Sequence, residues 1–328
     1  MHGGLDARRC AELARVAEAS GLAAVWFAEN PFQRGVLPAL TACALGTERV
    51  RLGIGVFNPY NRHPTLMAME TAALDEISGG RVILGIGSGI GSRVRQMGLA
   101  YQRPIGAVRD AVTIARGLLA GDEVTYSGKV FSAQGARLEH RPRRSDIPIY
   151  VAAMGDQALR LTGEVGDGLM ISNGCAPGYT VRAIALMHEA AKVAGRPAPA
   201  AVVQYVPCAI DADGDAARRV ARAFVGGMLL HYWRHGGDAP AVRAAHLEHT
   251  GIDNHDFARA MERLAAGEPA AGVLDDRFLA AYALAGTADE CLAQAQIYAR
   301  AGVTELGLTF LGDAPERAMA QLGRAAIS

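Results

Sequence analysis

Two polar, glycine-bearing loops follow neighbouring apolar segments and hold most of the residues that could do chemistry. The first, GVFNPYNRHP, runs from Gly55 to Pro64, and the second, GIGSG, runs from Gly85 to Gly89. Glycines in the second loop remove side chains where a ligand must approach the backbone, and backbone N–H groups there can meet an anion. The spacing is not GxGxxG, because Ile90 stands where the third glycine should be, so a Rossmann site is not indicated.

An acid and an amide, Glu29 and Asn30, follow a third apolar run that spans residues 24–28. A buried carboxyl group has a raised pKa and can then give a proton to a substrate. The amide of Asn30 can only donate and accept hydrogen bonds, so it is not a general base at neutral pH. A carboxylate held in a strand-end turn or a salt bridge would fit the sequence equally well.

The prominent histidines do not indicate a metal site. His63 and its neighbour Arg62 precede Pro64, which suits the first position of a helix, so we interpret both as structural. His231 and His235 share a helical face, but HYWRH lacks the glutamate of the HExxH zinc motif. We therefore predict no bound metal.

The elements that must position these residues alternate between strand and helix. The strands read as continuous apolar runs, which is typical of a parallel sheet buried on both faces. In such sheets the loops at the carboxyl ends of the strands carry the active site. A stretch from 121 to 146 lacks a helical period, and we expect a short hairpin across 124–126 and 129–131. The expected strands are 24–28, 50–56, 81–86, 149–153, 169–172, 201–210 and 305–310.

Four stretches resemble a known family. They are RVRLGIGVFNPYNRHP, LDEISGGRVILGIGSG, IPIYVAAMGDQALRLTGEVGDGLMIS and AGVTELGLTF. They resemble the bacterial-luciferase-like flavin and deazaflavin oxidoreductases, most closely the coenzyme F420-dependent methylene-tetrahydromethanopterin reductase branch. The resemblance implies an α/β fold: a TIM-like (β/α)8 barrel with inserted segments at its C-terminal mouth, forming one domain over 1–328. It also implies lid helices over 212–285 and a first barrel strand that is missing or truncated, since only Met1 to Leu5 precede the first helix.

The resemblance also implies a cofactor site for coenzyme F420, with FMN as the alternative. It places a non-proline cis peptide bond between Gly55 and Val56, against the cofactor ring. By this resemblance, Glu29 and Asn30 are expected to take the catalytic positions. The loop at Gly85 to Gly89 and the one from 152 to 157 are expected to hold the phosphate of the cofactor. The implied cofactor-binding residues are Gly55, Val56, Asn58, Gly87, Ser88, Gly89, Ala153, Met154, Gly155 and Asp156.

The activity that the resemblance implies is hydride transfer between reduced deazaflavin and a small organic substrate. An FMN-dependent monooxygenase that uses O₂ is the alternative, and a non-catalytic flavin-binding relative is a third possibility. Asn30, which stands where many monooxygenases have histidine, favours F420, as does the NPYNRHP stretch. Family members usually pair through barrel helices, so we expect a homodimer.

Composition excludes several other classes of protein. The 328 residues carry no net charge, so neither nucleic acid nor an anionic membrane surface is an expected partner. The N-terminus lacks an apolar signal segment, and no run approaches the ~20 residues of a membrane span. Five scattered cysteines without a CxxC motif fit a reducing, cytoplasmic location. In DEISGGR we predict a structural turn, with Gly79 ending a helix and Asp75 paired with Arg81.

Overall fold

The computed structural model describes residues 1–235 and 240–326, and the chain divides into two compact units. The first unit comprises Met1–Ala153, Arg160–Leu169 and Ala190–Pro199. The second unit comprises Met154–Leu159, Met170–Glu189 and Ala200–Ser328.

Four parallel strands form the sheet of the first unit. Their order is β1 (Ala24–Phe27), β2 (Arg51–Phe57), β3 (Val82–Ile86) and β6 (Ile149–Ala152). The strands are buried almost throughout, as their apolar runs predict. The strand β2 passes closely beneath Trp26, because a Cβ at Gly53 would fall 2.1 Å from the indole ring. The Trp26 ring in turn stacks at 6.1 Å on Tyr150 of β6.

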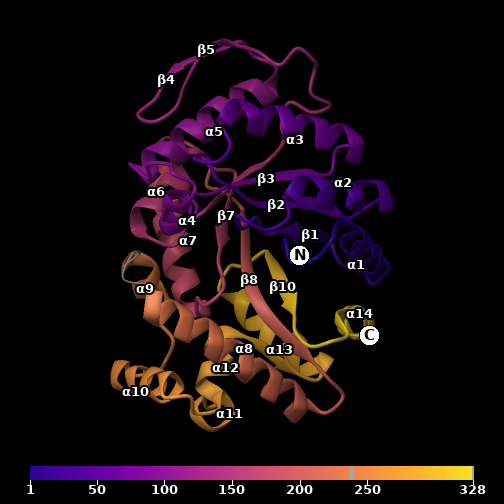
Figure 1. The fold of residues 1–328 in the computed structure, drawn as a ribbon, viewed down its shortest axis with the longest axis vertical. Helices are drawn as coiled ribbons and strands as arrows, with labels where there is room; N and C mark the ends of the chain where they lie inside the picture. Colours follow the sequence, from indigo (N-terminus) through magenta and orange to yellow (C-terminus); the bar gives the residue numbers. More distant parts are fainter. Residues whose placement is uncertain (236–239, 327–328) are drawn as a thin grey trace. The chain divides into compact units, whose positions relative to one another are not determined.

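Helices connect these strands and pack around them (Figure 1). The helix α3 begins at Pro64 with His63 as its N-cap, and it ends at Gly79, whose φ of 74° is the left-handed conformation that glycine favours. Both sequence predictions for this helix are therefore confirmed. The helices are α1 (Ala7–Ala19), α2 (Val36–Gly46), α3 (Pro64–Ser78), α4 (Gly91–Gln96) and α5 (Pro104–Ala120).

A two-stranded hairpin, labelled β4 and β5 in Figure 1, makes up part of the stretch from 121 to 146. Its strands are β4 (Val124–Ser127) and β5 (Ser132–Ala136), so the second strand starts three residues later than predicted. The buried carboxylate of Asp110 in α5 fixes the hairpin. It accepts hydrogen bonds from the backbone N–H groups of Val130 and Phe131 and from the Tyr126 hydroxyl.

The far end of the same stretch is anchored by an ion pair. Arg144 contacts Asp75 at 2.6 Å, and the Asp75 side chain is fully buried. Asp75 also accepts a hydrogen bond from the Val82 amide. The predicted pair of Asp75 with Arg81 is therefore wrong, because the Arg81 guanidinium instead donates to backbone carbonyls that include those of Ala44 and Val50.

The first residues of the chain lie against β1. The amino group of Met1 donates to the Trp26 carbonyl at 2.7 Å, and the Ala28 amide donates to the Met1 carbonyl. His2 forms an isolated parallel bridge with Ala28. The first barrel strand was expected to be missing or truncated, and among the described residues only this isolated bridge stands in its place.

The second unit is built on β8 (Ala201–Ile210), which pairs in parallel with β9 (Leu284–Gly286) and β10 (Glu305–Phe310). The sequence prediction omitted β9. The strand β7 (Gly168–Ile171) is divided, with Met170 and Ile171 in this unit. A capping box at Thr287, also predicted, starts the helix after β9. The remaining helices with residues in this unit are α6 (Asp156–Val165), α7 (Pro177–Val193), α13 (Ala288–Arg300) and α14 (Pro315–Ala325).

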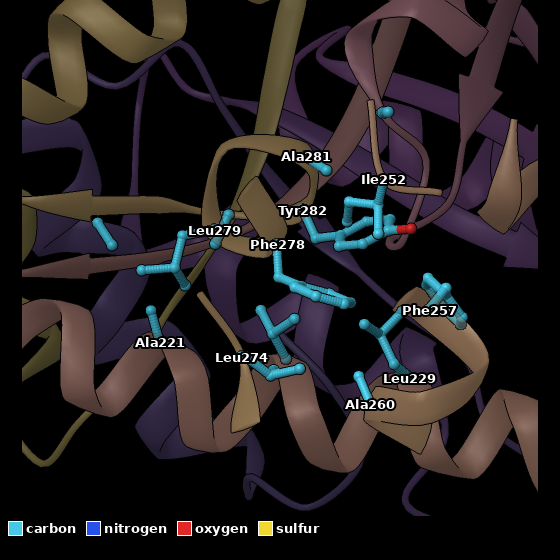
Figure 2. Close-up of a cluster of buried hydrophobic side chains, with 14 of the residues drawn as sticks. Ala221, Leu229, Ile252, Phe257, Ala260, Leu274, Phe278, Leu279, Ala281 and Tyr282 are labelled. Carbon is cyan, nitrogen blue, oxygen red and sulfur yellow. The ribbon is translucent and has the colours of Figure 1, made fainter. Parts of the chain in front are cut away.

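The segment from 212 to 285 is mostly helical, as expected, and has an apolar core of its own. Figure 2 shows Phe257, Phe278 and Leu274 among the buried side chains of this cluster. The Phe257 and Phe278 rings lie 5.8 Å apart. Among the described residues, no helix is long and apolar enough to cross a membrane. The helices of this segment are α8 (Gly214–His235), α9 (Pro240–Leu247), α10 (Asn254–Ala265), α11 (Ala270–Val273) and α12 (Asp276–Tyr282).

Candidate functional site

Three charged side chains meet just beyond the carboxyl ends of β1 and β2. Glu29 follows β1, and both of its carboxylate oxygens accept hydrogen bonds at 2.9 Å from one nitrogen of Arg62. The Nε atom of Arg62 lies 2.6 Å from a carboxylate oxygen of Glu70 in α3. The Glu29 side chain is only 9% exposed, so this is a largely buried cluster.

The loop after β2 is folded so that Arg62 turns back over the strand. The Asn58 side-chain oxygen accepts a hydrogen bond from the Tyr60 amide, and the Arg62 amide donates to the Asn58 carbonyl. This local turn is one that asparagine favours. The Arg62 guanidinium then lies 4.2 Å from the centre of the buried Phe57 ring, a cation–π contact. These contacts agree with the interpretation of Arg62 as a structural residue and with the salt bridge considered for Glu29.

The pKa of the Glu29 carboxyl is raised above its usual value, chiefly because burial penalises the charged form. Arg62 opposes this effect and Glu70 adds to it. Glu29 can therefore hold a proton at a pH where an exposed glutamate would have lost it. The neighbouring Asn30 is half-buried, and its backbone carbonyl accepts a hydrogen bond from Gln33.

The peptide bond between Gly55 and Val56 is cis, as the resemblance implies. It coincides with a shift in the pairing of β2 with β3, between Ile54 and Phe57. The glycine loop after β3 lies directly against this point. A Cβ at Gly87 would fall 2.8 Å from Cγ2 of Val56, and the Gly87 amide donates to the Phe57 carbonyl.

Asn58 and Gly89 form a second contact between the two loops. Gly89 has a φ of 71°, and a Cβ there would fall 2.1 Å from the Asn58 side-chain nitrogen. Asn58 is 5% exposed. The Ser88 hydroxyl is half-buried and makes a long contact of 3.5 Å to the Gly89 carbonyl, so it can bind an anion without breaking a strong hydrogen bond. The first unit thus brings together Gly55, Val56, Asn58, Gly87, Ser88 and Gly89.

The remaining predicted cofactor residues follow β6. Ala153 is buried in the first unit, whereas Met154, Gly155 and Asp156 belong to the second. Within the second unit, the Tyr179 hydroxyl donates to the Met154 carbonyl, and a Cβ at Gly155 would lie 3.0 Å from Cβ of Ala241.

Asp156 begins α6, and a cation from α7 balances its charge. Arg182 contacts an Asp156 oxygen at 2.7 Å and also lies 3.5 Å from Glu248. A helix N-terminus with a neighbouring arginine can receive a phosphate, but Asp156 competes for the same guanidinium. The sequence prediction missed Arg182, because 26 residues separate it from Asp156.

The histidines take structural places. His63 caps α3 by accepting a hydrogen bond from the Thr65 amide, which confirms its structural interpretation. His246 is 3% exposed, its ring centre lies 4.3 Å from that of Tyr232, and burial lowers its pKa to about 4. The side chain of His235 falls outside the described part of the chain. Among the described residues, no three potential metal ligands come together.

Known proteins resemble this chain along nearly its whole length. A 5,10-methylenetetrahydromethanopterin reductase from Methanolobus tindarius is 32% identical over 323 residues, which cover 96% of this chain and 94% of that protein. The enzyme of the same name from Archaeoglobus fulgidus is 32% identical over 298 residues, covering 89% and 86%. The solved structure of coenzyme F420-dependent tetrahydromethanopterin reductase from Methanopyrus kandleri has a TM-score of 0.85 and 28% identity, and covers 100% of this chain and 96% of that one.

This agreement confirms the predicted TIM-like (β/α)8 barrel class of fold. The family described as luciferase-like monooxygenase matches residues 1–305. The extent of that match and the coverage of the relatives agree with the resemblance noted in the sequence. The chain therefore belongs to the luciferase-like monooxygenase family.

Proposed function

We propose that this protein is an oxidoreductase that uses coenzyme F420 to transfer a hydride to or from a small organic substrate. The observation that carries the proposal is the contact of Val56 with Gly87 in the glycine loop after β3, in the same unit as the buried acid Glu29. The two relatives described above are named as methylenetetrahydromethanopterin reductases, and the solved relative as F420-dependent.

The chemistry of the residues suits this cofactor. Val56 offers an apolar surface for one face of a flat ring, while Asn58 and the glycine backbone at Gly87 and Gly89 offer polar groups without bulk. Within the first unit, Ser88 is suited to the phosphate of the cofactor. The deazaflavin, when bound, supplies the hydride; the protein supplies binding and orientation.

Glu29 is suited to handle the proton that accompanies the hydride. Reduction of a neutral carbon–carbon double bond adds one hydride and one proton, and the raised pKa of Glu29 keeps a proton available. In the opposite direction, oxidation of an alcohol releases a proton that the carboxylate can accept. Asn30 cannot move a proton at neutral pH, and we assign it an orienting role through hydrogen bonds.

FMN-dependent monooxygenation remains the alternative that shares these loops. Two observations favour F420: the solved relative from Methanopyrus kandleri is F420-dependent by name, and Asn30 stands where the resemblance places a histidine in many monooxygenases. We also propose that helices α8 to α12, which lie within residues 212–285, are the lid helices.

We further propose a homodimer in the cytoplasm. An apolar stripe on α3 supports pairing, because Leu66, Met69 and Ile77 are 38%, 47% and 46% exposed and share one face of the helix. Beside it lies a mostly apolar groove of about 220 Å³ that also includes Leu118 and Leu138. The five cysteines are free and buried, which fits a reducing compartment.

The test is to measure the binding of F420 and of FMN in parallel, with fluorescence quenching as the readout. We expect micromolar F420 affinity and much weaker FMN binding. Ser88→Asp should weaken F420 binding by about tenfold or more, since it adds a negative charge beside the phosphate. Ser127→Asp, the matched control, adds the same charge at an exposed position of β4 and should change F420 binding little. Preference for FMN, or binding of neither cofactor, would contradict the proposal.

A further inference from the structure

We propose that Arg62 and Glu70 are positioning residues for Glu29: the guanidinium fixes its carboxylate, and Glu70 competes for that guanidinium and so controls how readily Glu29 takes a proton. This inference rests on the proposed function only for its catalytic meaning. The electrostatic coupling of Glu29 to Arg62 and Glu70 is a property of the first unit and can be measured without cofactor.

The geometry shows that Arg62 is held from three sides. Its terminal nitrogen contacts both oxygens of Glu29, its Nε faces Glu70, and the flat face of the guanidinium lies over Phe57. These partners come from three elements: the turn after β1, helix α3 and strand β2. An arginine fixed in this way holds the Glu29 carboxylate in one orientation, which a flexible lysine would not do.

The charges do not cancel. Two carboxylates share one guanidinium, so the cluster carries a net charge of −1 when all three groups are ionised. The side chains of Glu29, Arg62 and Glu70 are only 9%, 17% and 20% exposed, and water therefore screens this excess charge poorly. Protonating one acid relieves the repulsion, and Glu29 is the more buried of the two.

Arg62 and Glu70 therefore act on Glu29 with opposite signs. The positive charge of Arg62 favours the ionised carboxylate, whereas the negative charge of Glu70 favours the protonated acid. These signs follow from the charges alone and would hold for a purely structural cluster too. The effect on kcat, measured below, distinguishes a tuned proton donor from an ion pair that merely ties β1 to α3.

The experiment is an NMR titration of the Glu29 side-chain carboxyl carbon in the cofactor-free protein. Arg62→Gln should shift the titration midpoint upward, and the nearly isosteric Glu70→Gln should shift it downward. Glu12→Gln is the matched control, since Glu12 forms an exposed ion pair with Arg9 in the same unit. It should leave the midpoint unchanged. Glu70→Gln keeps the test valid if Arg62→Gln does not fold.

Kinetics with F420 give the second readout. Arg62→Lys keeps the charge but loses the paired hydrogen bonds, so we expect kcat to fall at least tenfold while KM stays within about twofold. Unchanged midpoints, or shifts in the same direction for both variants, would overturn the inference. If the midpoints move as expected but F420 does not bind, the proposed function fails and the electrostatic coupling of Glu29 to Arg62 and Glu70 is still supported. If F420 binds and the midpoints do not move, the reverse holds.

Discussion

A Cβ atom at Gly89 would lie only 2.1 Å from the side-chain nitrogen of Asn58, which is too close for both atoms to fit. This contact joins the loop after β2 to the loop after β3. It explains why a glycine is required at this position twice over, once for the positive φ and once for the space.

We expect Gly89→Ala to destabilise the protein more than Gly98→Ala. Both glycines have a positive φ, of 71° and 76°, and a side chain there costs roughly 1 kcal/mol. Gly98 has open space around its missing Cβ, whereas Gly89 faces Asn58, which adds roughly 1–3 kcal/mol. Urea unfolding of the two variants measures the difference. Equal losses would mean that Asn58 moves aside freely.

Glu29→Gln should lower kcat by about 10²–10⁴-fold, the usual contribution of a general acid. The wild-type rate of reduction should fall as pH rises through the pKa of Glu29, because the acid must carry its proton. Since that pKa is raised, the fall should come at a higher pH than for an exposed glutamate. Steady-state kinetics against pH test this. A Glu29→Gln variant that kept the wild-type profile would remove Glu29 from the mechanism.

His246 should make the protein less stable in mild acid. Its pKa falls from an ordinary 6.5 to about 4 on folding, because burial disfavours the charged ring. The unfolded chain therefore binds more protons between these values, and stability is complete above pH 6.5 and declines as pH falls towards 4. The loss amounts to about 3 kcal/mol.

Thermal unfolding across this pH range should reveal the effect of His246. His246→Phe should flatten the pH dependence of stability. His188→Phe is the control, because His188 lies on an exposed position of α7. Equal slopes in the wild type and His246→Phe would assign the acid sensitivity to other groups.

Arg144→Met should destabilise the protein by about 3–5 kcal/mol, since it leaves the fully buried Asp75 carboxylate without its cation. Arg143→Met is the natural comparison, because Arg143 is the exposed neighbour in the same loop. Its effect should stay within about 0.5 kcal/mol. Chemical denaturation measures both. Similar values for the two arginines would argue against a stabilising role for the Asp75 contact.

If α3 forms the dimer contact, Met69→Glu should convert a dimer to a monomer in light scattering. A charge in the middle of an apolar interface must be desolvated without a partner. Val193→Glu changes a more exposed apolar residue, 84% exposed, away from α3, and should leave the dimer intact. A wild-type protein that is monomeric would contradict the proposed assembly.

The succession of strands and helices could be predicted because each buried strand is an apolar run bounded by glycine or polar residues. The strand β9 was not predicted, because three residues are too few to show a hydrophobic period. The hairpin strand β5 was placed too early, since Gly128 and the Asp110 contacts fix the turn and neither is visible as a pattern.

The site was predictable only where a local motif carried it. The glycine loop and the turn at Asn58 are contiguous stretches, so their types could be read from the sequence. The contact between Glu29 and Arg62 spans 33 residues, and that between Asp75 and Arg144 spans 69. Such partners are chosen by the tertiary fold, and several arginines were available to each acid.

The hairpin stretch between α5 and β6 has its own attachments at both ends. Asp110 fastens one end and the Asp75–Arg144 pair the other, while the strands of the sheet lie outside this span. The stretch also touches the loop after β2, because the Phe131 ring lies 5.6 Å from His63 and 6.2 Å from Tyr60. The residues between these attachments can therefore change during evolution without disturbing the barrel strands, provided that Phe131, the two acids and their partners remain.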